Sequence, residues 1–82
     1  MLFFQNKYRT LLNEKLNRIQ MNFENNYKDA AQMNLKEYEE LLLELINSNK
    51  IKGSGKQYYE DKLNYYKEQM KRFTHKDQKP KW

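Results

Sequence analysis

Apolar residues recur three or four positions apart along the first part of the chain, with Leu11 on the flank of the series. The series reads Phe4, Tyr8, Leu12, Leu16, Ile19 and Phe23. This spacing puts the residues on one face of a helix, and polar residues such as Asn6 and Glu14 lie on the other side. The pattern predicts a helix over about residues 3–24.

A second series follows at the same spacings of four and three. It reads Tyr27, Ala31, Asn34, Tyr38, Leu41 and Leu45, and it is widened by Leu35, Leu42 and Ile46. Four glutamates lie mostly on the flanks and back of the same segment: Glu37, Glu39, Glu40 and Glu44. The pattern predicts a second helix over about residues 27–49, with one buried face and an acidic outer side.

The junction between these helices is expected at Asn25 and Asn26, because asparagine tolerates the left-handed conformation that ends many helices. Two alternatives stay open. One continuous helix would also keep much of the apolar series. Asn34 could instead cap a helix that begins at Leu35, with Glu37 in its third position, although Asn34 lies within the apolar series. We favour the break near Asn25.

A third helix is predicted after the only two glycines of the chain, Gly53 and Gly55. Ser54 and Gln57 form a capping-box pattern at its start. Its apolar residues follow a 4-3-4-3 heptad spacing: Tyr59, Leu63, Tyr66, Met70 and Phe73. The predicted helix therefore covers about residues 56–73. Residues 74–82 have no apolar period and are expected to form a basic, disordered tail.

These elements predict an all-α protein, a small antiparallel three-helix bundle in a single domain over residues 1–73. The alternative is one long N-terminal helix with a shorter C-terminal helix folded back on it. A chain of 82 residues lies near the lower limit for independent folding, so a homodimer or a partner-bound state fits its size.

Composition excludes several classes of protein. The chain has no cysteine, so it has neither a disulfide framework nor a thiolate metal site. Its apolar runs, such as Met1 to Phe4 and Leu41 to Leu43, are far too short to span a membrane. The first four residues do not make a signal peptide. We therefore expect a cytoplasmic protein without a membrane partner.

The residues that support catalysis or cofactor binding are scarce. The single histidine, His75, lies in the expected tail, and the serines lack a neighbouring base. Glu37, Glu40 and Glu44 share one side of a helix but have no histidine beside them, so they indicate a solvated acidic face. The glycine turn lacks the pattern of a phosphate-binding loop. We expect no enzyme activity, no metal and no cofactor.

Charge is distributed unevenly along the chain. Residues 27–49 carry two basic and five acidic groups, whereas residues 50–82 carry ten basic and four acidic groups. The whole chain has a net charge of +5. Some of the acidic groups are expected to pair with the flanking helices, and the remaining asymmetry favours a charged partner or self-association.

One edge of the third helix carries aromatic and basic residues outside the core series. Tyr58 and Tyr65 lie seven residues apart, and Lys62, Gln69 and Arg72 lie along or beside the same edge. Tyrosine and arginine are enriched in the energetic centres of protein interfaces. The alternatives are stacking on nucleic acid and a wide core face that leaves the two tyrosine hydroxyls in water.

Two apolar residues off the core series are candidate oligomer contacts. Phe3 lies on the back of the first helix and Leu43 lies near the back of the second. Single exposed apolar residues are common, but both would suit contact with a second chain.

The sequence as a whole favours a non-catalytic protein that binds another protein. The enrichment in lysine, asparagine and tyrosine follows AT-rich coding, which fits a regulatory or inhibitory product of a phage or mobile element. The alternative is a nucleic-acid-binding protein that uses residues 56–73 and the tail. With only three arginines in the chain, that binding is expected to involve phosphates rather than bases. Binding to a membrane surface ranks below both.

Overall fold

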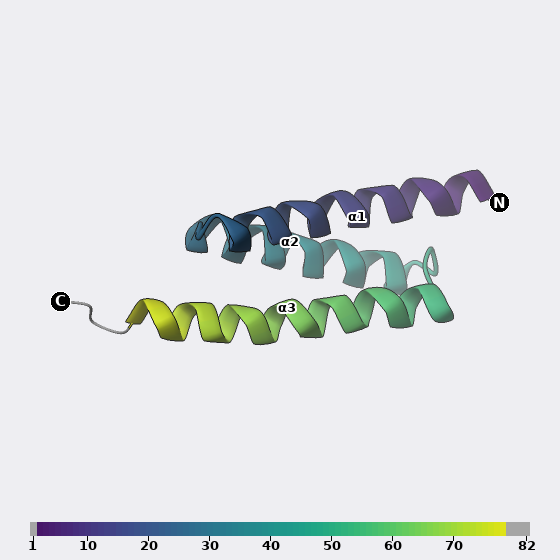
Figure 1. Ribbon diagram of the computed structural model, residues 1–82. Coiled ribbons are helices and arrows are strands. Elements are labelled where there is room, and N and C mark those ends of the chain that lie inside the picture. The colour runs from purple at the N-terminus through teal and green to yellow at the C-terminus, as the bar shows by residue number, and fades with distance from the viewer. Residues whose placement is uncertain (1, 79–82) are drawn as a thin grey trace.

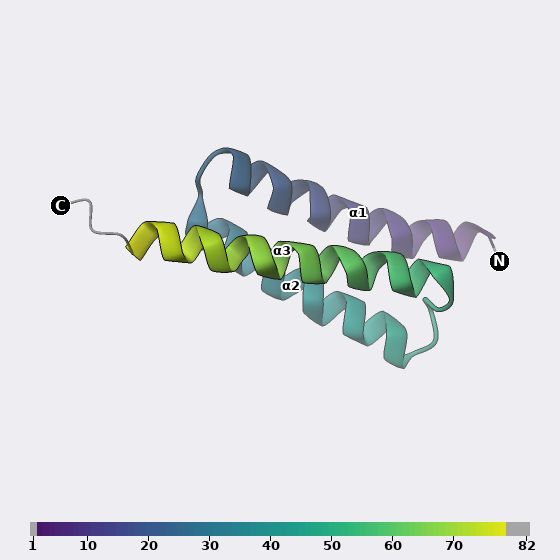
Figure 2. The same cartoon turned by 60° about the horizontal axis from the view of Figure 1, so that its bottom comes forward.

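Three α-helices form the described part of the chain in the computed structural model, which covers the backbone of residues 2–78 and the side chains of residues 7–72. They are α1 (Leu2–Glu24), α2 (Lys28–Asn47) and α3 (Ser54–Gln78). Each helix reverses the direction of the one before it, so α1 and α3 run the same way and α2 runs against both (Figures 1 and 2). The predicted antiparallel three-helix bundle is confirmed, and the alternative with one long N-terminal helix is excluded.

The second residue of each interhelical turn is an asparagine in the left-handed conformation. Asn26 has a φ of 60°, and the N–H groups of Asn26 and Tyr27 donate to the carbonyls of Phe23 and Asn22. Asn49 has a φ of 59°, and the N–H groups of Asn49 and Lys50 donate in the same way to the carbonyls of Ile46 and Leu45. This geometry satisfies carbonyl groups at the helix end and turns the chain away. The expected break near Asn25 is thus placed correctly.

The start and end of α3 differ from the prediction. The helix begins at Ser54, after Gly53 with a φ of 67°, so Ser54 lies within the first turn. The Gln57 side chain donates to Asp61 instead of reaching back, and the predicted capping box is wrong. At its far end α3 continues through residue 78, so residues 74–78 of the expected tail are helical. Residues 79–82 lie outside the described part of the chain.

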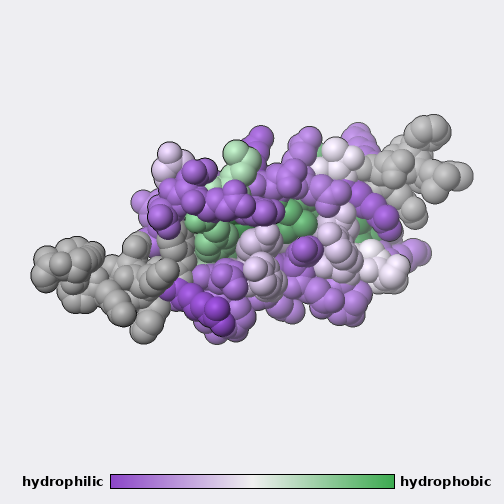
Figure 3. Space-filling view, viewed as in Figure 1, coloured by the Kyte–Doolittle hydropathy of each residue, from purple (hydrophilic) through white to green (hydrophobic). Residues whose placement is uncertain are grey.

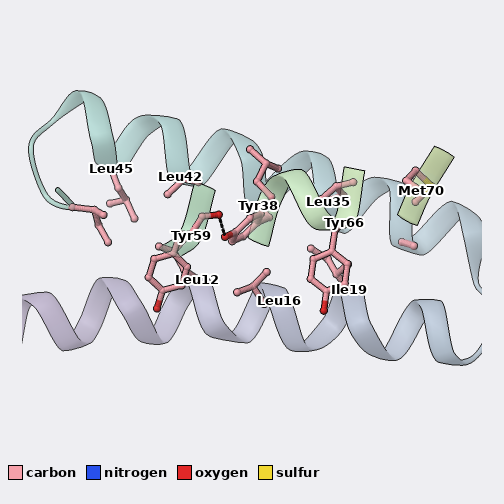
Figure 4. Packing of buried hydrophobic residues seen from close by; sticks show 13 residues of the cluster. Leu12, Leu16, Ile19, Leu35, Tyr38, Leu42, Leu45, Tyr59, Tyr66 and Met70 are labelled. Atoms are coloured by element: carbon pink, nitrogen blue, oxygen red, sulfur yellow. Dashed lines mark hydrogen bonds between the residues drawn. The ribbon is translucent and has the colours of Figure 1, made fainter. Parts of the chain in front are cut away.

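The core lies along the axis of the bundle and draws on all three helices (Figure 4). Its buried apolar residues are Leu12, Leu16, Ile19, Ala31, Leu35, Tyr38, Leu42, Leu45, Ile51, Tyr59, Leu63, Tyr66 and Met70. Most of them belong to the predicted series. Tyr27 belongs to the predicted series but not to the core, because it precedes α2 and is 61% exposed. Ile51, in the second turn, is buried although no helical pattern includes it.

Two ion pairs join the acidic flanks of α2 to its neighbours. Lys15 of α1 pairs with Glu37, and Lys67 of α3 pairs with Glu39 at 3.0 Å. Part of the acidic charge of α2 therefore pairs with basic groups of the neighbouring helices, as expected. Among residues 2–78, no helix has the length and apolar character needed to cross a membrane.

Candidate functional site

A groove runs between α1 and α3 on the side of the bundle away from α2. Its volume is about 690 Å³. Three residues of α1 and six of α3 line it: Gln20, Phe23, Glu24, Tyr58, Asp61, Lys62, Tyr65, Tyr66 and Gln69. Figure 3 views the molecule from this side and shows apolar residues between the polar outer surfaces of the two helices. We call this feature the α1–α3 groove.

Aromatic residues make up the floor and one wall of the α1–α3 groove. The rings of Phe23 and Tyr66 stack across it, with centroids 5.7 Å apart and an interplanar angle of 13°. The exposed ring of Tyr65 meets Tyr66 edge-on at 5.0 Å, and Tyr58 meets the buried Tyr59 in the same way at 4.9 Å. Because each exposed ring rests on a buried one, the wall is held in a defined orientation.

The two tyrosines of the wall remain accessible to a partner. Tyr58 is 50% exposed and Tyr65 is 55% exposed. The ammonium group of Lys62 lies 5.6 Å from the centre of the Tyr58 ring, within the range of a cation–π contact. The wall therefore combines flat apolar surface with phenolic hydroxyls and one cation.

Polar groups border the α1–α3 groove on both sides. Glu24 accepts a hydrogen bond of 3.1 Å from Gln20, and Asp61 accepts one of 2.9 Å from Gln57. Burial raises the pKa of Tyr66 above its ordinary value, and the neighbouring Tyr65 and Glu24 raise it further. The phenol at the floor of the groove is accordingly neutral at physiological pH and can act as a hydrogen-bond donor.

The structure brings together four of the five residues that the sequence suggested for partner binding. Tyr58, Lys62, Tyr65 and Gln69 line the α1–α3 groove, whereas Arg72 is exposed on α3 without lining it. The α1 wall was not predicted. Phe23 had been placed in the core series, and only the pairing of α1 with α3 shows that it faces Tyr66.

The two suggested oligomer contacts have different outcomes. The side chain of Phe3 lies outside the described residues. Leu43 is 50% exposed on the outer face of α2, beside a shallow hollow of about 530 Å³. It shares no surface with the α1–α3 groove.

The described residues offer no metal centre. Among them, no group of three histidine, cysteine, aspartate or glutamate side chains is close enough to hold an ion. The α1–α3 groove itself presents an aromatic wall with a polar border.

Comparison with protein-family models, with curated proteins and with solved structures finds no match to this chain.

Proposed function

We propose that this chain is a non-catalytic cytoplasmic protein that binds another protein through the α1–α3 groove. The observation that supports this proposal is the pair of half-exposed tyrosines, Tyr58 and Tyr65, fixed on one wall of the groove by Tyr59 and Tyr66. Rigid tyrosines lose little conformational entropy on binding, and they contribute both apolar area and a hydroxyl.

The shape of the groove favours an amphipathic helix as the bound segment. α1 and α3 run in the same direction, and a helix laid between them would place apolar side chains three and four residues apart on Phe23, Tyr58 and Tyr65. Its polar flanks would meet Glu24 and Asp61 on opposite walls. We propose that the chain acts as a regulatory or inhibitory protein of a phage or mobile element, by covering a surface of its target.

Crosslinking from the groove tests the proposal. A photoreactive phenylalanine analogue at Tyr65 is expected to trap one protein from nuclease-treated lysate of the source cells, while the same analogue at Met21 does not. With the trapped protein purified, Tyr58→Ala/Tyr65→Ala should weaken binding by at least about tenfold.

The matched control is Met21→Ala/Tyr27→Ala, which truncates two side chains of similar exposure outside the groove. We expect this control to change the dissociation constant by less than about threefold. Equal affinity of the groove variant and the unchanged chain would contradict the proposal.

Nucleic-acid binding is the second candidate, because residues 50–82 carry six more basic than acidic groups and Lys62 lies beside exposed Tyr58. Bases would stack on the tyrosines and phosphates would meet the lysines. Fluorescence anisotropy with single-stranded RNA and DNA at several salt concentrations tests it. Affinity should fall steeply with salt, and affinity that does not change with salt would rule this candidate out.

A further inference from the structure

The outer face of α2 is an unpartnered surface with a regular pattern. Six residues lie on it at spacings of 4-3-4-3-4, opposite the buried side of the helix: Asp29, Met33, Lys36, Glu40, Leu43 and Asn47. We call this set the α2 seam. All six are exposed, and Met33 and Leu43 are 56% and 50% exposed. The 4-3 spacing is that of a helix that packs along a second helix.

The charged residues of the α2 seam form no ion pair with the other described residues of the bundle. Lys36 and Glu40 take part in no ion pair among the described residues. By contrast, Glu37 and Glu39, on the flanks of the same helix, pair with α1 and α3. The bundle therefore uses the flanking charges of α2 and leaves the charges of the seam to solvent.

The α2 seam is complementary to itself when it is reversed. Met33 and Leu43 lie five residues on either side of position 38, and Lys36 and Glu40 lie two residues on either side of it. In an antiparallel pair of α2 helices related by a two-fold axis at this position, each residue faces its mirror position on the second copy. Met33 then faces Leu43, and Lys36 faces Glu40. At the ends, Asp29 faces Asn47, whose amide can donate to the carboxylate.

We propose that the α2 seam docks on the α2 seam of a second copy of this chain, in the antiparallel direction. Charge selects this direction, because a parallel pair in the same register would place Lys36 against Lys36 and Glu40 against Glu40. Shape supports it as well. The shallow hollow beside Leu43, lined also by Glu40, Glu44, Asn47 and Ser48, receives Met33 of the second copy. A methionine side chain adapts well to an irregular apolar site.

The contact is small, so the dimer exchanges readily with the monomer. A helix of 20 residues spans about 30 Å, and one helix pair buries less area than a standard stable interface. The α1–α3 groove stays open in this dimer, because it shares no residue with the α2 seam. One dimer would thus present two grooves, and a bivalent partner would bind it more tightly than a monomer.

Charge reversal tests the pairing. Dimerisation is measured by sedimentation equilibrium across the micromolar to millimolar range. Either Lys36→Glu or Glu40→Lys alone places like charges opposite each other at two positions of the dimer. Each is expected to weaken dimerisation by at least about tenfold. The combined variant Lys36→Glu/Glu40→Lys restores opposite charges and should return to within about threefold of the unchanged chain. Glu14→Lys, an exposed reversal on α1, is the control, and circular dichroism checks that every variant folds.

Cysteine crosslinking tests the antiparallel direction of the two α2 helices, and the chain has no native cysteine that would form competing disulfides. A mixture of Met33→Cys and Leu43→Cys chains should form a disulfide-linked heterodimer under mild oxidation. Either variant alone should not, because two copies of position 33 would lie about 15 Å apart along the helices, beyond the reach of a disulfide. A monomer at all concentrations, a double variant as weak as the single ones, or crosslinking of each variant mainly with itself would overturn the proposal.

Discussion

The phenolic hydroxyl of Tyr38 donates a hydrogen bond of 2.7 Å to the backbone carbonyl of Tyr59, inside the core (Figure 4). Tyr38 belongs to α2 and is completely buried, while Tyr59 belongs to α3 and is 3% exposed. The hydroxyl of Tyr59 in turn donates to Asn13 of α1 at 2.9 Å. These two bonds link all three helices through tyrosine side chains, and the second of them joins α1 to α3, the two helices that form the groove.

Removing the first of these hydroxyls should destabilise the fold without disrupting it. Tyr38→Phe keeps the ring in place and deletes one buried hydrogen bond, so the free energy of unfolding should fall by about 1 kcal/mol. Tyr38→Ala also leaves a cavity, and a loss of about 3–5 kcal/mol is expected. Urea denaturation followed by circular dichroism measures both variants. Equal stability of Tyr38→Phe and the unchanged chain would show that the bond contributes nothing.

Two substitutions of Asn26, the left-handed residue after α1, should affect the stability of the fold differently. Asn26→Ala forces a residue with a Cβ and no compensating side-chain polarity to a φ of 60°, which should cost about 1 kcal/mol. Asn26→Gly removes the steric cost and should leave the stability unchanged or raise it by up to about 1 kcal/mol. Thermal unfolding distinguishes the two. Asn17→Ala, at an exposed position within α1, is the control and should be slightly stabilising.

The sequence predicted the three helices and their antiparallel order, but not which side chains meet between them. Asn26 could be recognised as a helix end because its side chain suits one rare backbone conformation, which is a local property. Ile51 could not be recognised as core, because its burial depends on how the second turn folds against the helices. The role of Phe23 could not be predicted either, since nothing local indicates that its ring stacks on Tyr66. The α3 edge of the groove could therefore be predicted, while its α1 wall required the tertiary structure.

The buried tyrosines make the fold sensitive to alkali. Burial raises the pKa values of Tyr38, Tyr59 and Tyr66 above the ordinary value of 10.0. A tyrosine with a raised pKa in the folded state holds its proton more tightly there than in the unfolded chain. Its stabilising effect is complete below pH 10 and is lost as the pH rises through the folded-state pKa. We expect the melting temperature to be constant from pH 7 to 9 and to fall above pH 10.

A variant separates this effect from general alkaline denaturation. Tyr38→Phe/Tyr66→Phe removes two of the groups that must ionise, so its melting temperature should fall less steeply above pH 10 than that of the unchanged chain. Parallel curves for the two proteins would show that these phenols are not the cause.

The ion pair between Lys15 of α1 and Glu37 of α2 should make the melting temperature depend on pH in the acid range. Lys15, through its hydrogen bond and its charge, lowers the pKa of Glu37 below 4.5. A carboxyl group of this kind stabilises the folded state above its unfolded pKa, and the contribution is lost as the pH falls through the folded value. The melting temperature of Glu37→Gln should therefore depend less on pH between 5 and 3. Glu14→Gln, which removes an exposed carboxylate of α1 without an ion pair among the described residues, is the control.

Neighbouring tyrosines on α3 should separate binding from folding. Tyr66 is 9% exposed and Tyr65 is 55% exposed, although their rings are in contact. Tyr66→Ala opens the core and should reduce the free energy of unfolding by about 3 kcal/mol or more. Tyr65→Ala removes one edge-on ring contact and should cost about 0.5–1 kcal/mol. If urea denaturation instead gives similar losses of unfolding free energy for both variants, Tyr65 contributes mainly to the core. Its exposure would then no longer support a binding surface.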